Sequence, residues 1–135
     1  MVGSVRTVPR TRLDTERVRA ALGAPAMTWS WQQGRVVTTA STDTIADGVA
    51  GRLPLAEVLE DLLVVADDAV LVREESIVAG VRLLHERAGL VVEPSAALGV
   101  AAILEDPERF TGRRVVTVVC GGNVDPDAHR RWVGP

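Results

Sequence analysis

The stretch VTVVCGGNVD, residues 116–125, contains the strongest fold signal in the sequence. It belongs to a β-branched run, RRVVTVVC (113–120), of the kind that forms a central strand of a parallel sheet. The run ends abruptly in the tetrapeptide CGGN (120–123). Ligands of open α/β sheets bind at the carboxyl ends of strands, and glycines leave the backbone bare there. A Gly-Gly pair after a strand is a weak motif, so a binding loop and a tight turn around a small buried thiol are equally compatible with it.

Helix and strand signals alternate along the rest of the sequence. Apolar periodicity predicts helices over 24–34, 55–63 and from 74 to a closing Gly89, and a short strand over 69–72. One or two further helical turns are expected within 13–22, capped by Asp14 or Thr15. Residues 96–104 contain no charge and many small side chains, as expected of a helix buried on all sides. This alternation predicts an α/β fold with three layers, in which helices flank a mostly parallel sheet.

Composition excludes several classes of protein. The 135 residues are 47% hydrophobic, which suits about one packed domain. A net charge of −3 gives no basic footprint, so we expect no nucleic-acid partner. No apolar run reaches membrane-spanning length, so no membrane partner is expected either. The single cysteine, Cys120, excludes an internal disulfide and fits a reducing cytoplasm, the expected location.

Lysine is absent from the sequence. All 15 basic residues are arginine, which stays protonated and cannot form an imine at ordinary pH. These residues therefore cannot hold a carbonyl cofactor through a lysine Schiff base.

Four segments together have a recognisable order and spacing: GAPAMTWSWQQGRVV (23–37), TIADGVAG (44–51), residues 67–104 with VVEPS, and VTVVCGGNVD. They resemble the C-terminal part of the serine/threonine dehydratases, or threonine ammonia-lyases. Those are pyridoxal-phosphate enzymes of the tryptophan-synthase-β (fold type II) superfamily, which includes serine racemase. The resemblance covers residues 23–126 and implies part of the large domain of such an enzyme. It leaves a divergent leader (1–22) and a polar tail (127–135).

The resemblance also implies a set of cofactor-binding residues. Cys120 takes the place of the family residue that faces the pyridine nitrogen of pyridoxal 5'-phosphate, and a thiol is a weak, neutral partner for it. Glu93 of VEPS matches a glutamate at the back of the same pocket. Gly121 and Gly122 would line the edge of the ring, and Gly48 of TIADG belongs to a loop near the cleft between the family's two domains.

Three other family features are missing from these residues: the reactive lysine, the Ser-Gly-Asn-His loop that holds the substrate carboxylate, and the glycine-rich phosphate loop. We therefore expect no catalytic residue within the chain, no covalent attachment of the cofactor and no self-sufficient catalysis. Some relatives bind a divalent metal before the GAPAM-like segment. Ala20 and Ala26 stand where oxygen-bearing side chains would be needed, so no such metal site is expected.

Two kinds of function remain. The first is the C-terminal segment of an ammonia-lyase that converts a small hydroxy amino acid to a 2-oxo acid and ammonia. It would be either half of a split enzyme, completed by a chain carrying the N-terminal half, or the remnant of a truncated gene. The alternative is a non-enzymatic, degenerate domain that oligomerises and binds a small molecule or a partner protein. Uncovered apolar surface would favour a homo-oligomer with Trp29 or Trp31 near the contact.

Three polar residues are assigned structural roles. His85 is expected at the boundary of an amphipathic helix, and His129 in a solvated tail. Ser95 is expected to begin or cap a helix, because no base is placed beside it.

Overall fold

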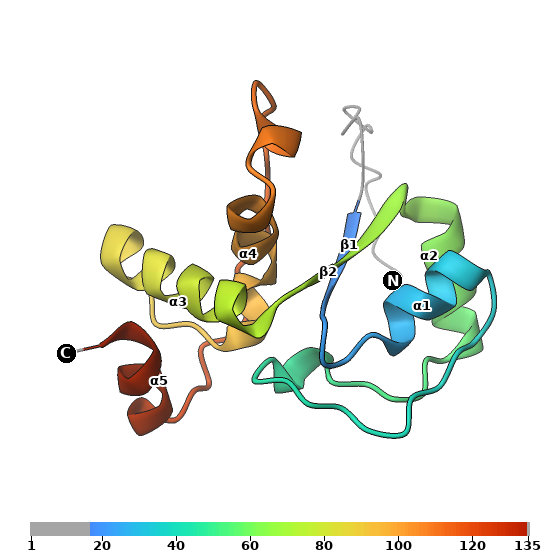
Figure 1. Ribbon diagram of the computed structural model, residues 1–135, viewed down its shortest axis with the longest axis horizontal. Helices are drawn as coiled ribbons and strands as arrows, with labels where there is room; N and C mark the ends of the chain where they lie inside the picture. Colours follow the sequence, from blue (N-terminus) through green and yellow to red (C-terminus); the bar gives the residue numbers. More distant parts are fainter. Residues whose placement is uncertain (1–16, 135) are drawn as a thin grey trace, which may run out of the picture.

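A computed structural model describes residues 17–134, and two parallel strands form its centre (Figure 1). β1 (Arg17–Ala21) pairs with β2 (Asp68–Val72) in a register that sets Arg17 opposite Asp68 and Ala21 opposite Val72. Figure 1 shows α1 and α2 on one side of the strands and α3, α4 and α5 on the other. The predicted α/β class with flanking helices is therefore confirmed. The helical elements are α1 (Ala26–Gln33), η1 (Asp47–Val49), α2 (Ala56–Val65), α3 (Glu74–Ala88), η2 (Pro94–Ala97), α4 (Leu98–Glu105), η3 (Glu108–Phe110) and α5 (Pro126–Val133).

Glycines end two helices where the sequence predicted. Gly34 follows α1 with a φ of 64°, and Gly89 follows α3 with a φ of 65°. Both are in the left-handed region, where the absence of a side chain lets the backbone reverse and satisfy the last carbonyl groups. The amide of Gly89 donates to the carbonyl of His85 at 2.9 Å.

The prediction of helical turns within 13–22 is wrong, because residues 17–21 form β1. Ala20 and Ala21 are buried, and the amide of Leu22 continues the pairing by donating to the carbonyl of Val72 at 2.8 Å. Strand pairing in the core has overridden the local helical preference of an alanine-rich segment. The expected caps, Asp14 and Thr15, lie outside the described residues.

The helix rich in small residues packs closely, as predicted. Ala101 and Ala102 of α4 join Val72 and Ile77 in one buried cluster. Where α3 passes the start of α4, a β-carbon at Gly80 would lie 3.1 Å from the carbonyl oxygen of Ala97. The helix is not buried on every side, since Leu104 is exposed.

The apolar face of α2 is mostly exposed. Of the five apolar residues whose spacing predicted the helix over 55–63, Leu59 is buried and Leu62 half-buried. The other three, Leu55, Val58 and Leu63, are exposed. Across the described part of the chain, no helix is both long and apolar enough to cross a lipid bilayer.

Residues 113–120 do not form the central strand that their composition predicts. They run extended, and among residues 17–134 their backbone pairs with no other strand. Exposure nevertheless alternates, from 37% at Val115 and 39% at Val119 to 69% at Val116 and 77% at Val118. Thr117 lies against α4, because a β-carbon at Gly99 would be 1.9 Å from its Oγ1. The segment thus has one face on α4 and an open opposite face, as a sheet strand without neighbours would.

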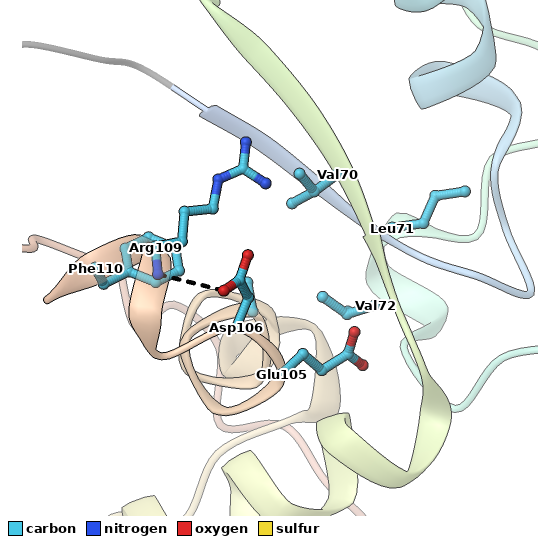
Figure 2. Close-up of a pocket in the computed structure, with 8 residues that line it drawn as sticks. Val70, Leu71, Val72, Glu105, Asp106, Arg109 and Phe110 are labelled. Atoms are coloured by element: carbon cyan, nitrogen blue, oxygen red, sulfur yellow. Dashed lines mark hydrogen bonds between the residues drawn. The ribbon is translucent and has the colours of Figure 1, made fainter.

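A cavity of about 230 Å³ lies beside β2 (Figure 2). Three consecutive residues of β2 line it, and their side chains alternate in direction, so the cavity follows the strand edge. Arg109 forms an ion pair with Asp68 near the beginning of β2, and its amide donates to Asp106. The lining residues are Val70, Leu71, Val72, Ala102, Glu105, Asp106, Arg109 and Phe110.

Glu105, at the end of α4, connects this helix through hydrogen bonds to Arg73, which follows β2. Its Oε1 accepts from the amide of Arg73 at 2.7 Å and from the Nε of Arg73 at 3.3 Å. Burial alone would raise the pKa of Glu105. Hydrogen bonds from Ser76 and Arg73, together with the charge of Arg73, outweigh burial and hold the pKa below its usual 4.5.

Substitution of Gly99 tests the contact between 113–120 and α4. We expect Gly99→Val to lower the free energy of unfolding by about 2 kcal/mol, because the new side chain overlaps Thr117. Gly51→Ala is the control, since a β-carbon there meets nothing within 4 Å. Urea unfolding of both variants measures the difference, and an equal cost at the two positions would contradict the contact.

Glu105→Gln tests the attachment of α4 to β2. Because the pKa of Glu105 is lowered in the folded state, its contribution is complete above the unfolded value and is lost as the pH falls through the folded value. We expect the variant to be less stable by about 1 kcal/mol at pH 7, and this difference to shrink in acid. Urea unfolding across this range measures it, with Glu60→Gln on exposed α2 as control. A difference independent of pH would refute the assignment.

Candidate functional site

Two loops meet at the carboxyl end of residues 113–120. The amide of Glu93 donates to the carbonyl of Gly121 at 3.3 Å. A β-carbon at Gly122 would lie 3.1 Å from the carbonyl oxygen of Val91. The segment that leaves α3 therefore runs directly along the glycine pair, and Pro94 then begins η2 with buried side chains on one face.

The carboxylate of Glu93 lies on the bare backbone of Gly121. A β-carbon at Gly121 would be 2.3 Å from Cδ of Glu93 and 2.5 Å from each carboxylate oxygen. Gly121 also has a φ of 81°, a conformation that side chains with a β-carbon rarely adopt. Both observations require glycine at this position.

Gly48 forms the opposite side of the same site. A β-carbon there would be 2.8 Å from Oγ of Ser95 and 3.2 Å from Oε1 of Glu93. The loop before Gly48 is fixed from α3, because Oε2 of Glu74 accepts from the amide of Ile45 at 3.0 Å. η1, η2 and the glycine pair thus converge on one carboxylate.

The structure brings together four of the five residues predicted to bind a cofactor: Glu93, Gly121, Gly122 and Gly48. The fifth, Cys120, precedes Gly121 and is exposed. Ser95 also belongs to this group, although the sequence suggested only a cap. Its Oγ is buried and has no hydrogen-bond partner among the described residues. Its place directly after Glu-Pro was the one available signal.

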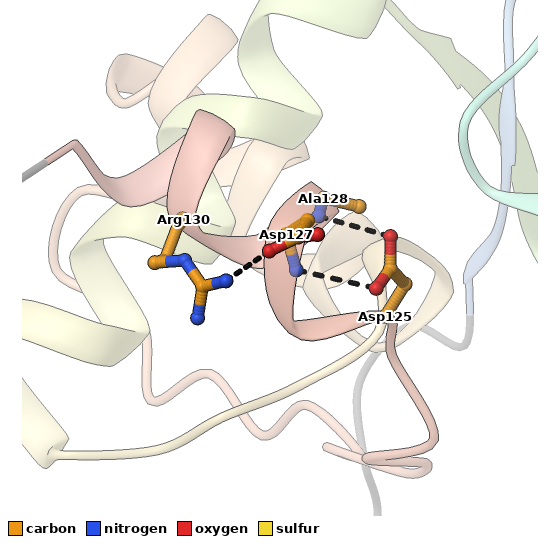
Figure 3. Close-up of polar contacts among 4 residues, drawn as sticks. All are labelled: Asp125, Asp127, Ala128 and Arg130. Atoms are coloured by element: carbon orange, nitrogen blue, oxygen red, sulfur yellow. Dashed lines mark hydrogen bonds and ion pairs between the residues drawn. The ribbon is translucent and has the colours of Figure 1, made fainter.

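The helix that follows the glycine pair is capped within the chain (Figure 3). The carboxylate of Asp125 accepts from the amides of Asp127 and Ala128, both at 3.2 Å, and Pro126 occupies the first helical turn. Arg130 forms an ion pair with Asp127 one turn along the helix. Asp125 therefore uses its side chain for the helix start and is not directed at the site.

The prediction that His129 is solvated is wrong. His129 lies on α5 with an exposed fraction of 6%, because this helix packs against α3. Nothing in the sequence indicates this contact, since the residues around His129 are polar.

The polar side chains of this group are packed against its glycines. Gly48 lies against the hydroxyl of Ser95 and the carboxylate of Glu93, Gly121 lies against the same carboxylate, and the thiol of Cys120 is exposed beside them. No amine or guanidinium belongs to the group. Within residues 17–134, no three or more His, Cys, Asp or Glu side chains are grouped to hold a metal ion. By its chemistry, the thiol of Cys120 suits the ring nitrogen of pyridoxal phosphate, whereas this group of residues offers no amine for the aldehyde and no cationic side chain for the phosphate.

Known proteins resemble this chain in sequence and in fold. Residues 13–121 match the family described as pyridoxal-phosphate dependent enzyme. An L-threonine ammonia-lyase from Geobacter sulfurreducens is 35% identical over 102 residues, which are 76% of this chain and 25% of that protein. A serine racemase from Oryza sativa subsp. indica is 34% identical over 110 residues, 76% of this chain and 32% of that protein. The chain spans about a quarter to a third of the length of these curated relatives.

Two solved structures extend the comparison. A threonine deaminase from T.th. superposes with a TM-score of 0.76 and 30% identity, over 81% of this chain and 35% of that one. Maize serine racemase superposes with a TM-score of 0.72 and 29% identity, over 87% of this chain and 36% of that one. With more than half of its residues matched, the chain belongs to the pyridoxal-phosphate dependent enzymes, as a segment with the fold type II architecture of the serine/threonine dehydratases.

Proposed function

We propose that these residues form the ring-binding wall of a pyridoxal-phosphate site that converts a small hydroxy amino acid to a 2-oxo acid and ammonia. The wall acts with a lysine supplied from outside the 135 residues. The observation that supports this most directly is the carboxylate of Glu93 resting on the backbone of Gly121, next to Cys120. Similar proteins include L-threonine ammonia-lyases and a beta-hydroxyaspartate dehydratase from Paracoccus denitrificans, which supports the substrate class.

Each residue of the wall has a role that its chemistry allows. When bound, the cofactor supplies an electron sink for loss of the α-proton and the β-hydroxyl group. The exposed thiol of Cys120 offers the ring nitrogen a neutral partner and so does not hold a proton there as a carboxylate would. Gly48 and Gly121 let Ser95 and Glu93 pack directly against the backbone and so shape the wall. Glu93 is held by the hydrogen bond that its backbone amide donates to the carbonyl of Gly121, and its side chain limits how far the ring can enter.

The missing lysine and phosphate cradle must come from a polypeptide that covers the open strand edges. One open edge belongs to β2, where the cavity lies. The other belongs to the extended segment 113–119, in which Val116 and Val118 are exposed. Both lie against α4, so a segment that pairs with them would lie in the layer whose carboxyl end carries Cys120. The proposed partner is therefore a strand-forming, lysine-bearing segment.

One observation favours the non-enzymatic alternative. Trp29 on α1 and the α2 residues Val58 and Leu63 are exposed, so apolar surface lies away from the cofactor wall. Self-association through this surface would give a homo-oligomer without any activity. Activity of a chimera with a known ammonia-lyase separates these two functions.

The first experiment uses the protein alone with pyridoxal phosphate, followed by borohydride reduction and peptide mass mapping. Because the sequence has no lysine, we expect no reduced adduct on any side chain. The α-amino group of the polypeptide can form an adduct, which the mass of the N-terminal peptide reveals. This adduct is an internal control that the reduction has worked. Cofactor fixed to an internal residue would contradict the proposal.

The second experiment replaces the matching segment of the Thermotoga maritima L-threonine ammonia-lyase, which is 36% identical, with residues 17–126. We expect the chimera to release 2-oxobutyrate from threonine. In the chimera, Cys120→Ala should lower kcat about tenfold, equivalent to about 1.4 kcal/mol of transition-state stabilisation.

Cys120→Ser is the matched control and should keep most of the activity, because a hydroxyl is also a neutral partner for the ring nitrogen. A chimera that binds the cofactor but releases no 2-oxo acid would favour the non-enzymatic function. Equal activity of the alanine and serine variants would show that the side chain of Cys120 has no role at the ring nitrogen.

A further inference from the structure

Two histidines meet between α3 and α5, away from the cofactor wall. The rings of His85 on α3 and His129 on α5 have centroids 5.0 Å apart and planes inclined by 74°. His129 is buried and His85 half-buried. This pair has no part in the proposed function, and the inference below does not depend on that function.

The two rings are held in place by a second contact between the same helices. Nε and Nη2 of Arg82 donate to the carbonyl of Trp132 at 3.2 and 2.9 Å. Arg82 precedes His85 by three residues, and Trp132 follows His129 by three. The helices therefore run antiparallel, with the arginine contact about one turn from the histidine pair. Trp132 and Leu84 also pack on the cluster around Val81.

The imidazoles have unused nitrogen atoms. Nδ1 of His85 and Nε2 of His129 are both buried, and neither has a hydrogen-bond partner among residues 17–134. The carboxylate of Asp125, which begins the helix that carries His129, is occupied by the amides of Asp127 and Ala128. A buried polar atom without a partner costs about 1–3 kcal/mol, so two of them on adjoining rings point to a missing ligand.

We propose that His85 and His129 together bind a divalent transition-metal ion of the zinc, copper or nickel type. Imidazole nitrogen suits these ions, whereas magnesium prefers oxygen. Zinc binds imidazole nitrogen at about 2.0–2.1 Å, so two rings sharing a tetrahedral ion have centroids about 5 Å apart. Water completes the coordination, since only two protein ligands are present. The ion joins α3 to α5 and so fixes the helix that follows the glycine pair.

Thermal unfolding of the untagged 135-residue protein with ZnCl₂, NiCl₂ or MgCl₂ tests this proposal. We expect the transition-metal salts to raise Tm by about 5 °C at saturation and magnesium to have no effect. His85→Leu and His129→Leu should each abolish the rise. Leucine fills the space without leaving an unpaired nitrogen, so folding is expected to survive both changes. If His129→Leu does not fold, the half-buried position 85 decides the outcome alone.

Cys120→Ser tests whether the thiol is the metal ligand instead. We expect this variant to keep the full rise in Tm. Copper(II) gives a second measurement, because its EPR spectrum should show splitting from two imidazole nitrogens in the wild type and one in His85→Leu. No rise in Tm with any transition metal, or a rise of equal size in His85→Leu, would overturn the proposal.

Discussion

The close approach of Glu93 to Gly121 is the contact on which the site depends. It places a carboxylate where any other residue at position 121 would put its β-carbon. Gly48 then approaches the same carboxylate from η1, and Ser95 fills the remaining side. Three segments far apart in the sequence can meet here because two of them lack side chains at the meeting point. Gly99 makes the same kind of contact: because it has no side chain, Thr117 can pack directly against α4.

The sequence predicted correctly where a helix ends when the end depends only on the residue at that position. Gly34 and Gly89 end their helices because a left-handed residue is needed there, whatever surrounds it. β1 was wrongly predicted because an alanine-rich segment becomes a strand only through pairing with β2, a partner some fifty residues away. For residues 113–120 the sequence predicted a strand that the structure does not show. Their composition describes a central strand, but a central strand also requires neighbours, and none lies within the described residues.

The candidate site was predictable from family resemblance and not from spacing. A Gly-Gly pair after a β-branched run predicts a turn as readily as a ligand loop, and only the joint occurrence of TIADG, VVEPS and CGGN favours the prediction of a ligand loop. Ser95 and the buried position of His129 were missed for one reason. Burial of an isolated polar side chain depends on which helices pack together, and neither helix shows that in its own sequence.

The open strand edges and the missing amine are consequences of one arrangement. Cys120 follows residues 113–119 directly, so a polypeptide that pairs with this segment must end its strand beside the ring wall. Carboxyl ends of parallel strands share one edge of a sheet, and the residues that follow them lie within reach of the same ligand. Sheet pairing would thus complete the core over Val116 and Val118 and, by the same geometry, bring new side chains to Glu93. Under the proposed function, stability and chemistry would thus be supplied together by the same pairing segment.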